Sequence, residues 1–386
     1  MNPKLHDTPS LPAILIGGPP HSGKTTLTDW LSHAVRAQGY PVYVLRASPD
    51  GEGSWYADTP EPLRSTLRAR AKNRWTAALA EDLAADVTRR SVPLLVDVGG
   101  MVSDEVRRIA ANCTHAILIA ADPAALAPWH ALVDAAGLTL LADLHSVLDA
   151  PHETIIAERP LRGSIVGLRP NGASDGILRQ ALVARIGETI GLQRERLAHY
   201  HASQIDIDLL LDLERSIYPL TRKAGGRWQP DELAPLLASI PAGEPLALYG
   251  SGPAWLSTAL ALHAAPATCM LFDARRGWIV PPQLTLIDAA VPDGPLGWSV
   301  QETAAHSHVQ FGIPGSYLDF RAPLSAPRLD PARGVILDGK LPIWLTVALA
   351  LAYAALPWVA VYQPLLGGAV VVAARSTYSL GDIVVL

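Results

Sequence analysis

The chain has 386 residues, of which 49% are hydrophobic and 17% are charged, and its formal net charge is −5. This balance predicts a globular protein of two or three domains, because one domain commonly takes roughly 150 residues. The small net charge argues against a protein that coats nucleic acid, so we expect no stable DNA or long RNA partner.

The cysteines and the first residues indicate the compartment. Cys113 and Cys269 lie far apart and have no C-x-x-C spacing, which argues against a disulfide framework and against a zinc cluster. Residues 1–12 lack the basic and apolar runs of a signal peptide. We therefore expect a cytoplasmic protein.

One apolar segment resembles a membrane span. Residues 341–362 carry no charge. Pro342 suits a first helical turn and Pro357 cannot continue a helix, so the expected helix covers only residues 342–355. Such a helix is about 20 Å long, too short for a hydrocarbon core of about 30 Å. We expect no membrane association, and residues 358–362 have the β-branched and aromatic composition of a buried strand.

The N-terminal part carries a motif for binding phosphate. Residues 11–17 have the pattern of a buried strand, residues 26–38 have helical periodicity, and the loop between them matches G-x-x-x-x-G-K-[ST]. In this motif backbone N–H groups surround the β-phosphate, Lys24 reaches the β- and γ-oxygens, and the Thr25 hydroxyl ligates Mg²⁺. The predicted ATP-binding residues are Gly18, Ser22, Gly23, Lys24, Thr25 and Thr26.

A second strand supplies the carboxylate that such a site needs. Residues 92–98 are apolar except for Asp97, which we expect to hold Mg²⁺ together with Thr25. Further apolar runs alternate with helical stretches, at residues 115–120, 138–142 and 164–168. This alternation predicts an α/β fold with a mostly parallel sheet and helices on both faces, a P-loop NTPase or kinase-like domain over residues 1–193.

Other charged residues near this domain have two interpretations each. Asp50 and Glu52 follow a strand and either assist Mg²⁺ and an acceptor or form a solvated turn. The basic stretch at residues 62–90 either contacts nucleotide or is a solvated helix face. Arg159 and Arg162 either offset transition-state charge or lie on the surface. Hydrolysis and phosphoryl transfer to a small acceptor both remain open.

The second half contains an internal repeat. Residues 253–262 and 342–351 share P-x-W-L-x-x-A-L-A-L, with seven identities in ten. Each follows a strand and a glycine turn and precedes two short strands. The sequence therefore predicts two tandem small α/β modules, at residues 228–296 and 297–386, behind a helical connector at residues 194–227. Two copies in one chain commonly replace the subunits of a symmetric dimer, so we expect a pseudo-dimer.

Residues 341–345 (LPIWL) and 362–372 (YQPLLGGAVVV) resemble the CRISPR-associated Csx-three family. The resemblance implies a CARF-related fold, homo-oligomeric assembly and a ring nuclease. Such an enzyme binds and linearises cyclic tetra-adenylate, the messenger of type III CRISPR antiviral defence. The family's activity has been tied to a divalent metal, notably Mn²⁺. Larger members carry a fused phosphate-loop ATPase, which fits residues 1–193.

The resemblance also implies a catalytic set, namely His263, Asp273 and Arg275 in the first copy. The equivalent places in the second copy hold Ala352, Gln363 and Leu365, which cannot do acid–base work. Independently, phosphodiester cleavage needs a proton shuttle and a cation, which His and Arg supply. The alternative is a helix-end histidine, a turn former and a surface charge. The glycine turns are the expected ligand-binding residues, Gly250, Ser251, Gly252, Asp338, Gly339 and Lys340.

Three functions therefore compete. In the first, the tandem modules cleave the messenger and the N-terminal domain has a coupled ATP-dependent activity. In the second, the modules only sense the messenger and switch a kinase or ATPase effector. In the third, both parts are degenerate and form a scaffold, against which the intact loop and Asp97 argue.

His306 and His308 share a strand face and could start a metal site, although no third ligand is apparent.

Overall fold

The computed structural model describes residues 11–48, 77–169, 176–214, 228–288, 294–313, 318–375 and 378–386. These residues form two compact units. The first unit contains the described residues up to Ser203 together with Ala274–Gly277, and the second contains the remaining described residues.

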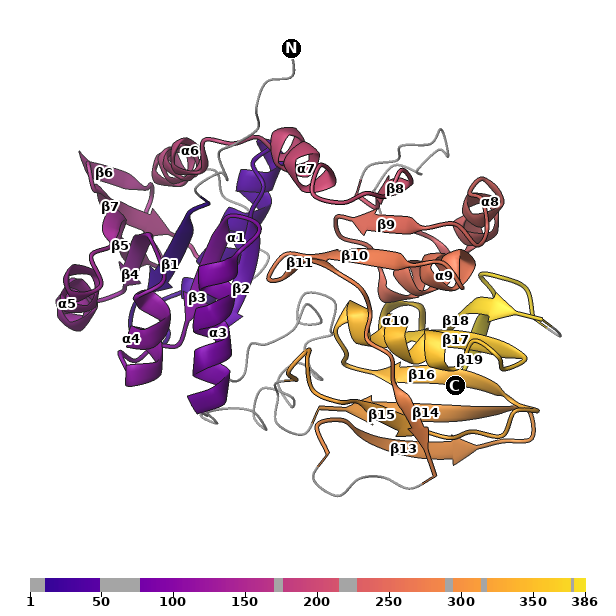
Figure 1. Ribbon diagram of the computed structural model, residues 1–386. Helices are drawn as coiled ribbons and strands as arrows, with labels where there is room; N and C mark the ends of the chain where they lie inside the picture. Colours follow the sequence, from indigo (N-terminus) through magenta and orange to yellow (C-terminus); the bar gives the residue numbers. More distant parts are fainter. Residues whose placement is uncertain are drawn as a thin grey trace, which may run out of the picture. The chain divides into compact units, whose positions relative to one another are not determined.

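The first unit is built on a seven-stranded sheet in the order β2-β3-β1-β4-β5-β7-β6 (Figure 1). Its strands are β1 (Ala13–Gly17), β2 (Tyr43–Ala47), β3 (Leu94–Val98), β4 (His115–Ala120), β5 (Thr139–Val147), β6 (Thr154–Glu158) and β7 (Leu161–Val166). Its helices are α1 (Lys24–Ala37), α3 (Ala77–Arg89), α4 (Asp104–Ala110), α5 (Ala127–Ala135), α6 (Ile177–Ile190) and α7 (Arg194–Ala202). All strand pairs are parallel except β6 with β7, which confirms the predicted mostly parallel sheet.

Helices cover both faces of this sheet, as predicted. Ile14 and Ile16 of β1 pack in one apolar cluster with side chains of α1 and α6. Successive side chains of a strand point to opposite faces, so Gly17 belongs to the other face. There a Cβ on Gly17 would lie 2.6 Å from the ring of Trp129 on α5. The strand is therefore buried from both sides, which explains its continuous apolar sequence.

The last strands of the first unit differ from their predicted bounds. The run expected at residues 138–142 extends to Val147, and the run expected at 164–168 begins at Leu161. The antiparallel strand β6 is not apparent from the sequence, because most of its side chains are exposed and it lies at the edge of the sheet. Hydrophobic periodicity identifies only strands with a buried face.

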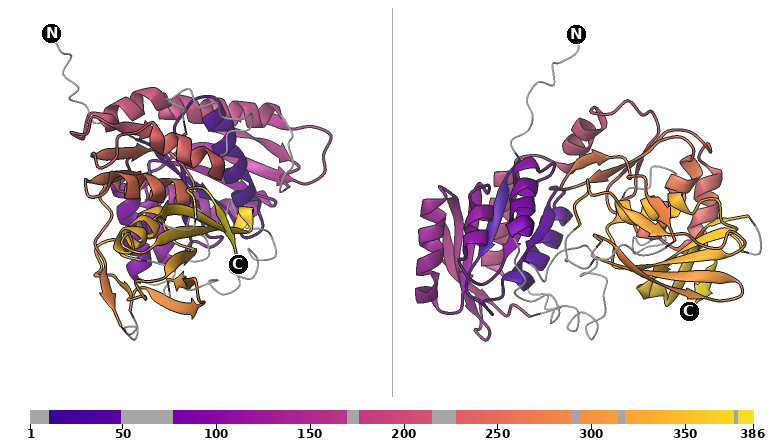
Figure 2. Two further views of the ribbon diagram at one scale, coloured as in Figure 1. Left: turned by 90° about the vertical axis from the view of Figure 1, so that its right-hand side faces the viewer. Right: turned by 60° about the horizontal axis from the view of Figure 1, so that its bottom comes forward.

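The second unit contains two larger sheets and a small one. The four-stranded sheet has the order β11-β10-β9-β8, the six-stranded sheet has the order β13-β14-β16-β17-β18-β19, and β12 pairs with β15. Figure 2 shows the strands of this unit, in orange and yellow, from two further directions. The strands are β8 (Leu210–Asp212), β9 (Leu246–Tyr249), β10 (Cys269–Asp273), β11 (Gly277–Ile279), β12 (Thr285–Ile287), β13 (Gly297–Glu302), β14 (His306–Gly312), β15 (Ser325–Pro327), β16 (Gly334–Gly339), β17 (Trp358–Gln363), β18 (Gly368–Ala374) and β19 (Ile383–Val385). The helices are α8 (Leu233–Ala238), α9 (Ala254–Ala264) and α10 (Ile343–Ala352).

The internal repeat is visible in the strand topology. In the first copy β8, β9 and β10 are parallel neighbours, and α9 connects β9 to β10. Strand β8 lies within residues 194–227, so this part of the predicted helical connector belongs to the first copy's sheet. In the second copy β14, β16 and β17 are parallel neighbours, and α10 connects β16 to β17. In both sheets the next strand, β11 or β18, adds to the side of the third. The two copies therefore share one local topology.

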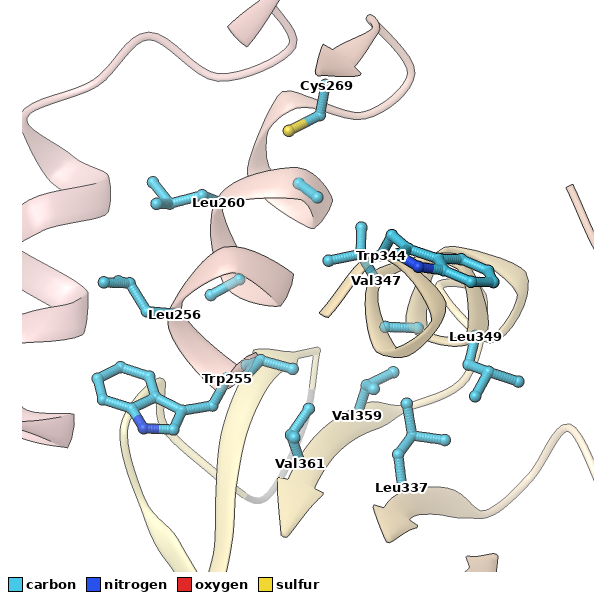
Figure 3. Close-up of a cluster of buried hydrophobic side chains, with 14 of the residues drawn as sticks. Trp255, Leu256, Leu260, Cys269, Leu337, Trp344, Val347, Leu349, Val359 and Val361 are labelled. Carbon is cyan, nitrogen blue, oxygen red and sulfur yellow. The ribbon is translucent and has the colours of Figure 1, made fainter. Parts of the chain in front are cut away.

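The repeated helices are buried against each other. Trp255 and Trp344 each occupy the second position of their helix, and they are 2% and 3% exposed. Both lie in one apolar cluster that joins the two copies (Figure 3). Helix α9 packs against α10 and also against β17 and β18. A helix that is apolar on all sides needs neighbours on all sides, which a single copy cannot provide.

The apolar segment near the C-terminus is a short helix followed by a strand, as predicted. Helix α10 ends at Ala352, three residues before the predicted end. Tyr353 follows it, and its buried hydroxyl donates to the Pro327 carbonyl oxygen at 2.7 Å. Among the described helices, none has the length and apolar character needed to cross a bilayer.

Candidate functional site

The loop at residues 18–25 joins β1 to α1 at the carboxyl edge of the sheet. Gly18 has a φ of 152°, and a Cβ there would lie 2.0 Å from the carbonyl oxygen of Ile119, so no side chain fits. Gly23 has a φ of 90° and caps the N-terminus of α1, while the Ser22 side chain is buried. The backbone therefore curls tightly before the helix begins. The positive end of α1 favours an anion at this place.

Lys24 is folded back onto its own loop. Its ammonium group donates to the carbonyl oxygens of Gly18 and Pro19, both at 2.7 Å, and approaches Ser22 Oγ at 3.5 Å. Burial lowers the pKa of Lys24 to about 8, and nearby Asp97 opposes this effect. The cation is thus held inside the loop by weak neutral acceptors, which an incoming phosphate can replace.

Asp97 lies beside the loop because β3 is the direct neighbour of β1. The register pairs Ile16 with Asp97, and the Thr25 hydroxyl donates to Asp97 Oδ2 at 3.1 Å. Burial raises the pKa of the Asp97 carboxyl above its ordinary value, whereas Arg46, the Thr25 hydroxyl and Lys24 oppose the rise. The structure therefore brings together the residues that the sequence predicts as metal ligands.

The oxygen atoms at this place suit a magnesium ion. A hydroxyl and a carboxylate are hard ligands of the kind that Mg²⁺ prefers. Among the described residues, no group of three or more His, Cys, Asp and Glu could hold a metal by itself. Mg²⁺ commonly keeps several waters and substrate phosphate oxygens and takes only one or two protein ligands. Thr25 and Asp97 therefore fit an ion that binds together with a nucleotide. Thr26, also predicted to bind ATP, follows Thr25 in the first turn of α1.

Two residues at this site were not predicted from the sequence. Arg46, near the end of β2, contacts Asp97 Oδ2 at 3.3 Å and Asp29 Oδ1 at 2.5 Å. Asp29 lies one turn after Thr25 on α1, so both side chains share a helix face. A single signal pointed to Arg46, namely its place at the carboxyl end of a strand. Asp29 carries no local signal, because an acidic residue in an amphipathic helix is ordinary.

Arg159 and Arg162 do not lie at the loop. Strand β7 is parallel to β5, so residues at its beginning lie at the amino edge of the sheet. Arg159 precedes β7, and Arg162 is its second residue and approaches Asp143 at 3.9 Å. The loop and Asp97 lie at the opposite, carboxyl edge. The expected transition-state role of these two arginines therefore has no support from the fold.

Several predicted contributors lie outside the described residues. These are Asp50, Glu52 and the basic cluster of Arg64, Arg68, Arg70, Lys72 and Arg74. Their predicted contacts with Mg²⁺ or nucleotide stay predictions.

The glycine turns of the two repeats occupy equivalent places but have different surroundings. Residues 250–252 follow β9 and precede α9, and residues 339–340 follow β16 and precede α10. In the first turn the Ser251 N–H donates to the Glu214 carboxylate at 2.8 Å. In the second turn Lys340 is exposed. The first turn thus contacts an anionic group, whereas the second includes an exposed lysine.

The structure does not bring His263 to Asp273 within the first module. Because β10 is parallel to β9, Asp273 at its end lies at the same edge as the glycine turn. Helix α9 runs back to the other edge, where His263 Nε2 contacts the Ile240 carbonyl oxygen at 2.9 Å. The His263 carbonyl there accepts a hydrogen bond from Gly243 N–H. The helix length therefore separates two members of the expected catalytic set.

Arg275 has a partner in the first unit. It belongs to Ala274–Gly277, which groups with that unit, and its Nε donates to Asp86 Oδ2 at 2.5 Å. Asp86 lies on α3 and is almost fully buried. This carboxylate holds the guanidinium by a charge-assisted hydrogen bond.

The second copy has a polar pair of its own. His308 on β14 contacts Asp338 on β16 through Nε2 and Oδ2 at 3.1 Å. His306 lies two residues earlier, next to the Trp358 ring, and burial lowers its pKa. The described residues add no third metal ligand to these histidines. The positions equivalent to the expected catalytic set hold Ala352, Gln363 and Leu365. Ala352 ends α10, Gln363 ends β17, and Leu365 follows β17 by two residues.

Residues 318–385 match the family model for CRISPR-associated protein (Cas_csx3). This C-terminal module is CRISPR-associated. The match begins before β15 and ends in β19, so it includes the repeated helix α10 and three of the residues expected to bind ligand, Asp338, Gly339 and Lys340. The matched residues thus lie within the second copy of the repeat, and β13 and β14 precede them. The loop at residues 18–25 lies outside the matched part.

Proposed function

We propose that the first unit binds ATP with Mg²⁺ and either hydrolyses it or transfers its γ-phosphoryl group. The hydrogen bond from Thr25 to Asp97 carries this proposal, because it joins the loop to the neighbouring strand. The buried Lys24 and the curled backbone of residues 18–25 support it. All the groups that the motif requires therefore lie at one edge of the sheet.

The residues have separate roles in this proposal. The Thr25 hydroxyl and the Asp97 carboxylate would hold Mg²⁺, which would neutralise phosphate charge. Lys24 leaves the carbonyl oxygens of Gly18 and Pro19 and donates to β- and γ-phosphate oxygens. The backbone N–H groups at the start of α1 orient the β-phosphate.

For the second unit we propose a pseudo-dimeric receptor for cyclic tetra-adenylate. The family match over residues 318–385 supports the ligand class, and the two glycine turns at helix N-termini suit its phosphates. Lys340 makes the second turn the better phosphate-binding site. In the first turn the Ser251 N–H already donates a hydrogen bond to Glu214. The sensor function, which switches an ATP-dependent effector, is therefore favoured over cleavage by one chain alone.

Cleavage of the messenger is the second candidate, and the family match supports it. Since His263 lies at the opposite edge from Asp273, the cleaving site would be composite. One copy of the chain would hold the ring against its glycine turns while another copy presents His263 or Asp273 with Arg275. Such a sandwich requires a homo-oligomer, and a divalent ion, Mg²⁺ or Mn²⁺, would assist it.

The deciding experiment uses the full chain and labelled cyclic tetra-adenylate, with and without ATP, in Mg²⁺ and in Mn²⁺. Binding without a linear product supports the sensor function, and a linear product supports the ring nuclease. In the second case His263→Ala should stop cleavage but keep affinity, whereas Arg275→Ala should reduce both. Cleavage that persists in the His263→Ala, Asp273→Ala double variant would exclude these residues as the catalytic set. Absence of binding would remove the receptor proposal.

A further inference from the structure

Arg46 connects the two carboxylates of the N-terminal site. Its guanidinium contacts Asp29 Oδ1 at 2.5 Å and Asp97 Oδ2 at 3.3 Å, and its side chain is only 13% exposed. Asp97 Oδ2 is also the atom that accepts the hydrogen bond from Thr25. The arginine and the expected metal ligand Thr25 therefore meet at the same carboxylate oxygen.

The two contacts of Arg46 differ in what a bound nucleotide would do to them. Asp29 lies on α1 beyond the residues that surround phosphate, so its contact with Arg46 can persist. Asp97 would instead face Mg²⁺, and two cations at one carboxylate oxygen repel each other. A γ-phosphate would then offer the guanidinium a new anion, because Asp97 and Thr25 would hold the ion that accompanies it.

We propose that Arg46 is the catalytic arginine of this site. On loading, its guanidinium moves from Asp97 to the γ-phosphoryl oxygens while Asp29 keeps it in place. The oxygen of water, or of an acceptor hydroxyl, forms the new bond to the γ-phosphorus. The bond to the β–γ bridging oxygen breaks, ADP takes the electron pair, and the proton of the nucleophile passes to released phosphate or solvent. Arg46 remains protonated and offsets the charge that spreads over the phosphoryl oxygens.

This inference rests on the proposed ATP-dependent function and adds a cation supplied by the same chain. The other arginines considered for this role, Arg159 and Arg162, lie at the amino edge of the sheet. Arg46 lies at the carboxyl edge, on the strand next to Asp97. Its planar fork suits two contacts at once, which lysine cannot reproduce.

The test compares Arg46→Ala and Arg46→Gln with Arg162→Ala as the matched control. Affinity for a fluorescent ATP analogue in Mg²⁺, steady-state ATP turnover and trapping of ADP with aluminium fluoride are measured, together with thermal unfolding. We expect both Arg46 variants to keep affinity within about threefold and to lose turnover by about 100-fold. They should also fail to trap ADP with aluminium fluoride, which mimics the transferring phosphoryl group. Arg162→Ala should match the unaltered protein. Arg46→Gln keeps a hydrogen-bonding group for Asp29, so it guards against misfolding of the alanine variant.

The outcomes separate this inference from the function on which it rests. If the unaltered protein turns over ATP and a folded Arg46 variant does so within threefold, Arg46 is not catalytic and the proposed function stands. An equal loss of affinity and turnover would assign Arg46 to nucleotide binding alone and would also overturn the inference. If the unaltered protein binds no ATP, the proposed function fails and the inference fails with it.

Discussion

The two units each carry a set of residues that the sequence predicts to act together, but only one set is assembled. In the first unit the loop after β1 and Asp97 in β3 meet, because neighbouring parallel strands end at the same edge. In the second unit His263 and Asp273 lie at opposite edges, since a helix separates them. A set of suitable residue types therefore forms a site only where the strand order and helix directions place all of its members at the same edge of the sheet.

The comparison extends to the two copies of the repeat. Both copies use the same strand order and the same buried tryptophan, but their glycine turns face different groups. Glu214 bonds to the first turn, and Lys340 belongs to the second. The two copies therefore share their buried core and differ in the residues at their turns.

The largest expected effect is on catalysis in the first unit. Lys24→Ala should reduce ATP turnover by about 1000-fold, because the lysine is the one side-chain cation that the loop motif places on the γ-phosphate. Steady-state hydrolysis and circular dichroism measure activity and folding. Lys340→Ala is the matched control, which should leave turnover unchanged and weaken the binding of cyclic tetra-adenylate. Unchanged hydrolysis in Lys24→Ala would remove the assignment of the loop.

A smaller loss is expected for the metal-holding carboxylate. Asp97→Asn should keep nucleotide binding and reduce Mg²⁺-dependent turnover by about 100-fold, because the amide is a poorer ligand for the ion. Turnover measured against Mg²⁺ concentration tests this. If Asp50 or Glu52 proves to be the essential carboxylate while Asp97→Asn is active, the metal lies elsewhere.

The equivalence of the two repeats can be tested through their tryptophans. Trp255→Ala and Trp344→Ala should each cost roughly 3–5 kcal/mol of stability, since both side chains are buried in one core. Chemical denaturation measures the free energy of unfolding. A cost confined to one of the two would show that the copies are not packed equivalently. Trp298→Ala, on the edge strand β13, provides a half-buried comparison with a smaller expected cost.

The smallest expected effect is a loss of stability of the first unit at acidic pH, which arises from the buried His201. Burial lowers the pKa of His201 to about 4, below its ordinary 6.5. The folded state then binds fewer protons than the unfolded state between these values, so stability falls as the pH drops from about 6.5 to about 4. At pH 5 the expected cost is about 2 kcal/mol relative to pH 7.5. Thermal unfolding against pH measures it. His201→Gln should flatten this dependence, whereas His199→Gln at an exposed position should not.

Much of the fold could be predicted because the signals are local. Residues 11–17 and 92–98 are continuous apolar runs, which only a strand buried on both faces requires. The loop at residues 18–25 carries its glycines, lysine and threonine within one short segment, so its identity does not depend on distant contacts. The repeat was apparent because a buried tryptophan and its leucines are constrained by packing in both copies.

The edge strands β6 and β8 and the long-range pairings could not be predicted in this way. Strand β6 exposes its side chains, and β8 is too short for a periodic pattern. The contacts of Arg46 with Asp29 and Asp97, of Arg275 with Asp86 and of His308 with Asp338 join residues far apart in the chain. The sequence around each of these residues gives no indication of its partner.

The sequence by itself determined the phosphate-loop motif, the carboxylate in the next apolar strand and the presence of two copies of one module. Each depends on residues within a few turns or one strand of one another. The tertiary structure alone decided which of these groups meet. It placed Asp97 beside Thr25 and brought Arg46 to Asp97 and Asp29, and it kept His263 away from Asp273. The physical reason is that strand order and helix direction set the edge at which a side chain emerges, and both follow from the packing of the whole core.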